Sequence, residues 1–112
     1  MEAWALQSEN YVMRPATKRA SARMSERTIH RIYTERKNSQ AIARLIGKEF
    51  ESFTIHPTVG YYRGGREDSI AIEIIGASPA AIRRLAAQIR DMNGQKSVLT
   101  IRFRARTESI RW

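Results

Sequence analysis

The stretch FTIHPTVGYYRGGREDSIAIEII, residues 53–75, decides the fold of this chain. It holds two runs rich in β-forming residues around the glycine pair Gly64-Gly65. Paired glycines tolerate the positive φ angles that tight hairpin turns need. The stretch therefore predicts strands over 53–62 and 69–75, joined by a turn over 63–68. Pro57 cannot donate a hydrogen bond to a neighbouring strand, so it favours an edge position or a bulge for the first strand.

A helix and then a strand are predicted on each side of this hairpin. Apolar residues recur at helical spacing in both helices, and Ser78-Pro79 is typical of a helix start. Asn93-Gly94 is typical of a helix end, and Met92 is expected to close the buried stripe of the second helix. In chain order, these flanking elements are expected over about 28–34, 39–50, 79–92 and 97–106.

The resulting order βαββαβ predicts an α+β fold of the ferredoxin-like type. This is a two-layer sandwich, in which a four-stranded antiparallel sheet carries both helices on one face. Ile70, Ile72 and Ile74 would point into the core between the layers. The other sheet face would be open, and an open face that mixes apolar and charged groups is usually covered by a ligand or another subunit.

The last strand carries the clearest functional signal. Its residues alternate between an apolar row, which we expect in the core, and an arginine row on the open face. Three interpretations of the arginine row stay open: ion pairs with Glu73 and other strand carboxylates in a subunit interface, a nucleotide or nucleic-acid surface, or solvated charge. The apolar row is Leu99, Ile101, Phe103 and Ala105, and the arginine row is Arg102, Arg104 and Arg106, with Thr100 beside them.

The hairpin tip offers a second candidate binding site in Tyr62, Arg63 and Arg66. An aromatic ring, two guanidiniums and exposed backbone N–H groups can grip a phosphate or a base. An ordinary turn has the same composition, and the spacing of a Walker loop is absent. Some of His56, Tyr62, Glu73 and Ile75 are expected on the open face with the arginine row. The outward side of the second helix carries Arg83, Arg84, Gln88 and Arg90, which extend the positive surface or are simply solvated.

Composition points to an anionic partner. The 112 residues include 20 lysines and arginines against 11 acids, for a net charge of +9. A basic surface of this size favours a nucleotide-like ligand, nucleic acid or an acidic protein, unless it serves solubility alone. Arginine outnumbers lysine, which favours forked contacts to phosphate or carboxylate.

The sequence lacks the residues that several classes of function require. No cysteine is present, which excludes disulfides, thiolate catalysis and Cys-ligated zinc. His30 and His56 are the only histidines, and no carboxylate cluster adjoins them, so we expect neither a metal site nor a cofactor. No serine-nucleophile motif occurs either, and we expect no enzymatic activity. No apolar run approaches the roughly 20 residues of a membrane span, and we expect a cytoplasmic protein.

Residues 1–26 differ from the rest and predict a basic, flexible extension before a domain over 27–107 and a tail over 108–112. The segment 14–23 holds four positive charges and no negative one. The extension is interpreted as a nucleic-acid-binding arm, as an interaction arm anchored by Trp4 and Tyr11, or as a leader that is absent if translation starts at Met24.

The hairpin sequence resembles the PII-like superfamily, and its CutA branch in particular. The resemblance rests on Thr58-Val59-Gly60-Tyr61-Tyr62-Arg63-Gly64, followed by Glu67-Asp68-Ser69 and an isoleucine-rich strand, and in element order it spans about 29–103. It implies a homotrimer whose open sheet faces pack inward and whose inter-subunit clefts hold a ligand. The long regulatory loop of PII proteins is replaced by a short turn, so their ATP and 2-oxoglutarate sensing is not implied. Copper binding is not implied either, because cysteine is absent.

Segments 33–38 and 93–99, together with the same hairpin, also resemble small proteins of phages and mobile elements, and a counter-defence role is expected if the chain belongs to such an element. From these observations we expect a non-enzymatic oligomeric protein that binds an anionic ligand or an acidic macromolecular surface. The alternative is a sequence-nonspecific nucleic-acid-binding module, because the RNA-recognition motif has the same element order. Its stacking aromatics are missing from the third strand, whose outward residues are Ser69, Ala71, Glu73 and Ile75.

Overall fold

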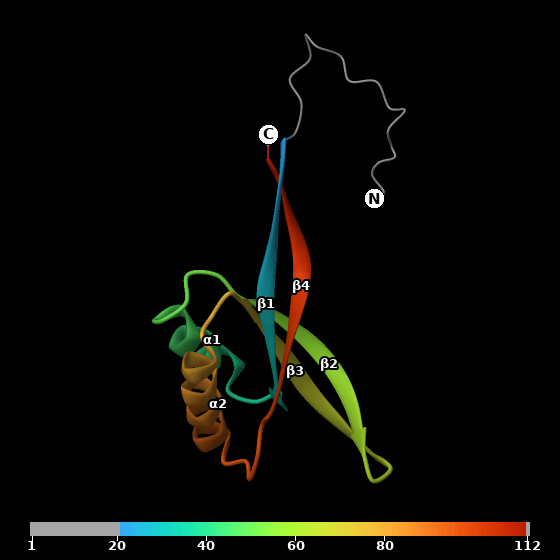
Figure 1. Ribbon diagram of the computed structural model, residues 1–112. Helices are drawn as coiled ribbons and strands as arrows, with labels where there is room; N and C mark the ends of the chain where they lie inside the picture. Colours follow the sequence, from blue (N-terminus) through green and yellow to red (C-terminus); the bar gives the residue numbers. More distant parts are fainter. Residues whose placement is uncertain (1–20, 112) are drawn as a thin grey trace. The chain divides into compact units, whose positions relative to one another are not determined.

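A computed structural model of the chain describes residues 21–111, which form one four-stranded antiparallel sheet and two helices that lie on the same face of it (Figure 1). The strand order in the sheet is β2-β3-β1-β4. This is the predicted ferredoxin-like α+β architecture. The elements are β1 (Ser21–Glu35), α1 (Ser39–Gly47), β2 (Thr54–Tyr62), β3 (Gly65–Ile75), α2 (Pro79–Asn93) and β4 (Leu99–Arg111).

The two ends of the chain group separately from the compact unit that holds the core. Residues Glu26–Thr107 group into one compact unit, which contains both helices and all the surfaces described below. Strand β1 begins at Ser21 and β4 ends at Arg111, so both strands are longer than predicted. The predicted flexible extension lies mostly outside the described residues, and its role stays a prediction.

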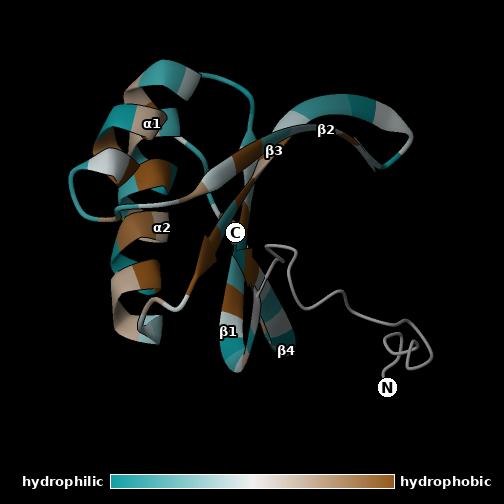
Figure 2. Cartoon of the chain, turned by 90° about the horizontal axis from the view of Figure 1, so that it is seen from above, coloured by the Kyte–Doolittle hydropathy of each residue, from teal (hydrophilic) through white to brown (hydrophobic). Residues whose placement is uncertain are grey.

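The core lies between the sheet and the two helices and consists almost entirely of isoleucine. Figure 2 shows hydrophobic segments along both helices and along β3. Hydrophobic side chains of the core cluster that are at most 2% exposed come from β1, β3 and both helices, as the apolar spacing predicts. They are Ile32, Ile42, Ile46, Ile70, Ile72, Ile74, Ile82, Leu85 and Ile89.

Helix α2 begins and ends as its sequence predicts. The Ser78 hydroxyl oxygen accepts a hydrogen bond from the Ala81 N–H at 3.1 Å, and Pro79 occupies the first helical position. At the other end Gly94 adopts a left-handed conformation with φ 65°, and its N–H donates to the carbonyls of Arg90 and Asp91. These caps fix both ends of the helix that borders the candidate site.

The β2–β3 hairpin is tighter than predicted. Its turn consists of two residues, Arg63 and Gly64, with φ values of 50° and 81°. Two successive positive φ angles give the turn type that matches the twist of antiparallel strands. Arg66 and Asp68 therefore belong to β3, where they pair with Tyr61 and Val59, instead of extending the turn. Strand β2 is an edge strand, which confirms the position inferred from Pro57.

A buried polar network joins the C-terminal end of α2 to the end of β1. The Asn93 side chain is 4% exposed, and its Nδ2 donates to Thr34 Oγ1 at 3.0 Å and to Gln95 Oε1 at 3.2 Å. Its Oδ1 accepts from Asn38 Nδ2 at 3.0 Å. Met92, predicted to be buried, is 39% exposed instead. Asn93 takes the inward position because it lies one helical turn after Ile89.

Candidate binding surfaces

The register of the central strands identifies the open face of the sheet. Ile32 pairs with Ile72, and both are fully buried beneath the helices. Neighbouring residues on a strand point to opposite faces, so Arg31 and its partner Glu73 lie on the open face. The register of β2 and β3 places His56, Tyr62, Glu73 and Ile75 on this same face, as predicted.

The structure reverses the predicted faces of β4. The Arg31 guanidinium, on the open face, lies 5.1 Å from the ring centroid of Phe103. Thr100 and Arg102 line a hollow together with residues of α2. On the same side of β4, Arg104 donates to Thr28 Oγ1 at 3.3 Å. The prediction that Arg102, Arg104 and Arg106 line the open face was therefore wrong.

The error has a physical cause. Alternation along a strand separates two faces, but it does not say which of them a helix covers. Strand β4 is an edge strand, and its helix-side arginines are exposed to solvent. Its apolar row lies on the open face, so apolar character did not indicate the core here.

The open face consequently carries exposed apolar side chains along β4. Leu99 is 61% exposed, Ile101 40% and Phe103 38%, and Ile75 on β3 is 45% exposed. Beside them, Arg31 Nε donates to Glu73 Oε2 at 2.9 Å. The pKa of Arg31 is raised by its hydrogen bonds to Glu73 and to Tyr33, so this guanidinium stays charged. Within one copy, Glu73 thus pairs with Arg31, while Arg104 of the arginine row pairs with Glu26 of β1. The role of the row in a subunit interface stays a prediction.

The hairpin residues are exposed but already have neighbours of their own. Tyr62 is 65% exposed, and the Arg63 guanidinium lies 5.3 Å from its ring centroid. Arg66 forms an ion pair with Asp68, with 3.2 Å between Nη2 and Oδ1. The six predicted residues fall into two groups near opposite edges of the sheet, because β2 and β4 are its two edge strands. One copy of the chain does not bring them into a single site.

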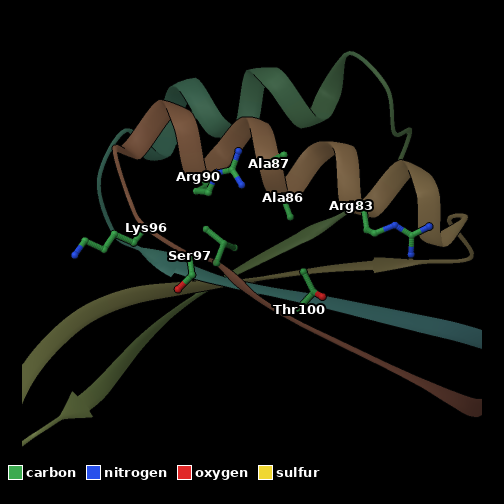
Figure 3. A pocket seen from close by; sticks show the side chains of 8 residues that line it. Arg83, Ala86, Ala87, Arg90, Lys96, Ser97 and Thr100 are labelled. Atoms are coloured by element: carbon green, nitrogen blue, oxygen red, sulfur yellow. The ribbon is translucent and has the colours of Figure 1, made fainter.

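A hollow between α2 and β4 is the feature that sequence reasoning missed. Figure 3 shows Arg83 and Arg90 extending from α2, with Lys96, Ser97 and Thr100 along the segment that leads into β4. Its volume is about 340 Å³, and Ala86, Ala87 and Val98 complete its lining. The signal was present in the sequence: Arg83 and Arg90 lie seven residues apart, on one side of a helix, with two alanines between them.

The described part of the chain contains neither a cluster of metal ligands nor a membrane-crossing helix. Over residues 21–111, no three histidine, aspartate or glutamate side chains gather as a metal site would require. Neither helix in this range combines the length and hydropathy of a membrane-crossing segment.

Comparison with known proteins gives matches in structure only. No protein-family model matches the sequence, and no curated protein matches it. The apo form of CPII, a nitrogen regulatory PII-like protein from Thiomonas intermedia K12, has a TM-score of 0.58 at 10% identity, over 80% of this chain and 99% of its own.

Two further structures agree. CutA from Synechococcus elongatus PCC7942, complexed with Bis-Tris, has a TM-score of 0.58 at 13% identity, over 80% of this chain and 89% of its own. A putative PII-like signalling protein from Thermus thermophilus has a TM-score of 0.52 at 16% identity, over 75% of this chain and 90% of its own. The chain therefore has the fold shared by PII-like and CutA proteins, as the hairpin sequence indicated.

Proposed function

We propose that the protein is a non-enzymatic binding or regulatory protein, which assembles through its open sheet face and binds an anionic, nucleotide-like ligand. The observation that carries the proposal is the exposed apolar row of β4. Leu99, Ile101 and Phe103 form a row of exposed large apolar side chains along an edge strand, and such a row is typical of an interface. Burying a fully exposed side chain of this size gains about 1.5–3 kcal/mol, and these side chains, which are already partly buried, would gain a fraction of that.

A second copy of the chain is the proposed cover for this face. Beside the apolar row of β4, the charges of Arg31 and Glu73 are already paired with each other, so an interface between identical copies can bury them without leaving either charge unpaired. The resemblance of the hairpin to PII-like proteins favours three copies.

Assembly also supports an anionic ligand. Tyr62 and Arg63 lie at the hairpin tip, while Arg102 belongs to the opposite edge strand. A ligand held by both groups needs two copies side by side. Structures of CPII hold ADP and bicarbonate, or ADP, AMP and bicarbonate, which supports a nucleotide-like ligand for this fold. If the chain comes from a phage or mobile element, as segments 33–38 and 93–99 suggest, sequestering such a ligand would act as counter-defence.

The test is native mass spectrometry of three proteins: the wild type, Ile101→Glu with Phe103→Glu, and Arg102→Glu with Arg104→Glu. The wild type should be an oligomer carrying a small-molecule adduct. The first variant should fall to the 12.9 kDa monomer, because charge on the open face prevents burial. The second alters the opposite face of the same strand, so its oligomer mass should persist while the adduct weakens.

Three outcomes would contradict the proposal. If the wild type were a monomer, or if only the arginine variant dissociated, the open face would not be the interface. A ligand that is chemically converted during incubation would show an enzyme.

The second candidate function is nucleic-acid binding, favoured by Arg102, Arg104 and Arg106. These side chains project from one face of β4 at intervals of about 7 Å, a spacing suited to contacts with successive backbone phosphates. Contacts of this kind release counterions, so affinity would fall steeply with salt. Protein that loses bound nucleic acid on nuclease treatment, and shows no small-molecule adduct, would favour this function.

A further inference from the structure

We infer that the groove between α2 and β4 binds a phosphate-bearing small anion, with Arg83 at its centre. The inference rests on the proposed anionic ligand, but it does not depend on assembly of the chain. It assigns that ligand to residues of a single copy, and most of them differ from those predicted from the sequence.

The groove consists of two hollows that share residues. The hollow of about 340 Å³ extends along α2 from Arg83 towards Lys96, and a second of about 360 Å³ extends from Arg83 to Arg102. Arg83 and Thr100 line both. Each hollow lies within the size range of small-molecule sites. Together they suit an elongated ligand that carries negative charge at more than one point, such as a diphosphate.

The lining is positively charged and contains no acid. Arg83, Arg90, Lys96 and Arg102 contribute to it, and neither aspartate nor glutamate does. Guanidiniums bind phosphate oxygens through two parallel hydrogen bonds, and the hydroxyls of Ser97 and Thr100 can add further ones. Pro79 lines the second hollow, which places the positive end of the α2 dipole beside the ligand.

Most cations of the groove lack a carboxylate partner that would compete with a bound anion. Arg31, Arg66, Arg84 and Arg104 each pair with an acid at 3.4 Å or less. Among the described residues, Arg83, Lys96 and Arg102 have no such pair, and only Arg90 does, with Asp91. These three side chains are exposed to solvent, so their charged groups are free to contact an anion that enters the groove.

A buried histidine adds a second, independent observation. His30 lines the second hollow and is 2% exposed. Its Nε2 donates to the Ala77 carbonyl oxygen at 2.9 Å, which leaves Nδ1 as the ring nitrogen available to a ligand. No partner of Nδ1 occurs among the described residues. A buried polar atom of this kind normally has a partner, and the hydroxyl of a hydrogen phosphate group would supply one.

The short side chains of α2 create the room for a ligand. Ala86 and Ala87 face the start of β4 between the two arginines of the helix (Figure 3). The segment opposite them is held in place by Gln95, whose Nε2 donates to the Ser97 carbonyl at 3.2 Å and whose Oε1 accepts from Asn93. Lys96 and Ser97 therefore belong to a fixed segment, and the groove is formed before any ligand arrives.

The experiment is isothermal titration calorimetry of the full chain with inorganic pyrophosphate and, separately, with ADP. Three proteins are compared: the wild type, Arg83→Ala and the matched control Arg84→Ala. Arg84 is the next residue on α2 but pairs with Glu49 at 3.0 Å, outside the groove. Arg83→Ala should weaken pyrophosphate binding about tenfold or more, as expected for a lost charge-assisted contact. Arg84→Ala should bind as the wild type does.

The other possible results would overturn the inference, each for a different reason. If both variants bound ADP as tightly as the wild type, the protein would still bind an anion, but the anion would not bind in the groove. If the wild type bound neither probe, both the groove proposal and the proposed anionic ligand would be wrong. The oligomer mass would still test the proposed interface. Binding of a single-stranded oligonucleotide alone would replace the small anion by nucleic acid. Amide NMR spectra of both variants would show whether they are folded.

Discussion

At the scale of single residues, Asn93 is at the centre of the buried hydrogen-bond network described above. It is buried and bonds to Thr34, Asn38 and Gln95. Asn93→Ala should lower the free energy of unfolding by about 2 kcal/mol, because its partners lose their hydrogen bonds within a low-dielectric interior. Urea unfolding followed by circular dichroism measures the change.

The matched control for this variant is Gln88→Ala, on the exposed side of the same helix. It should change stability by less than about 0.5 kcal/mol. An Asn93→Ala protein as stable as this control would show that solvent replaces the network at no cost.

At the scale of elements, the hairpin turn depends on Gly64, whose φ is 81°. At this angle a Cβ crowds the backbone of its own residue and its chain neighbours, so Gly64→Ala should destabilise the protein by about 1 kcal/mol, although no other part of the described structure lies within 4 Å of the added atom. Gly47, the last residue of α1, has equal space and no positive φ. Gly47→Ala should therefore stabilise by roughly 0.5 kcal/mol. Thermal unfolding of both variants tests this difference in sign, and a common sign would contradict it.

The elements also show what sequence reasoning can and cannot reach. The Ser78 and Gly94 caps, the existence of the hairpin and the helix stripes apart from Met92 follow from local rules, and these were predicted correctly. The orientation of β4 depends on how far the helices cover the sheet, which is a tertiary property. The groove between α2 and β4 was missed for the same reason, since its two walls come from separate elements and only the arginine spacing on α2 hinted at it.

At the scale of the whole molecule, the open face should couple folding to assembly. If copies bury the apolar row of β4 in one another, the wild-type melting temperature should rise with protein concentration over about a hundredfold range. The variant Ile101→Glu with Phe103→Glu should melt at a temperature independent of concentration, because it stays monomeric. Differential scanning calorimetry measures both melting temperatures. A wild-type melting temperature that does not change with protein concentration would contradict assembly through this face.

One feature of β4 limits how the chain can diverge. Between Leu99 and Phe103, successive side chains serve two different surfaces: the apolar face, and the groove that Thr100 and Arg102 line. Inserting or deleting one residue just ahead of β4 would exchange the two sets at once, which would place guanidiniums in the interface and isoleucine in the anion groove. Among relatives of this protein, the segment between Gly94 and Leu99 should therefore keep its length more strictly than its residues.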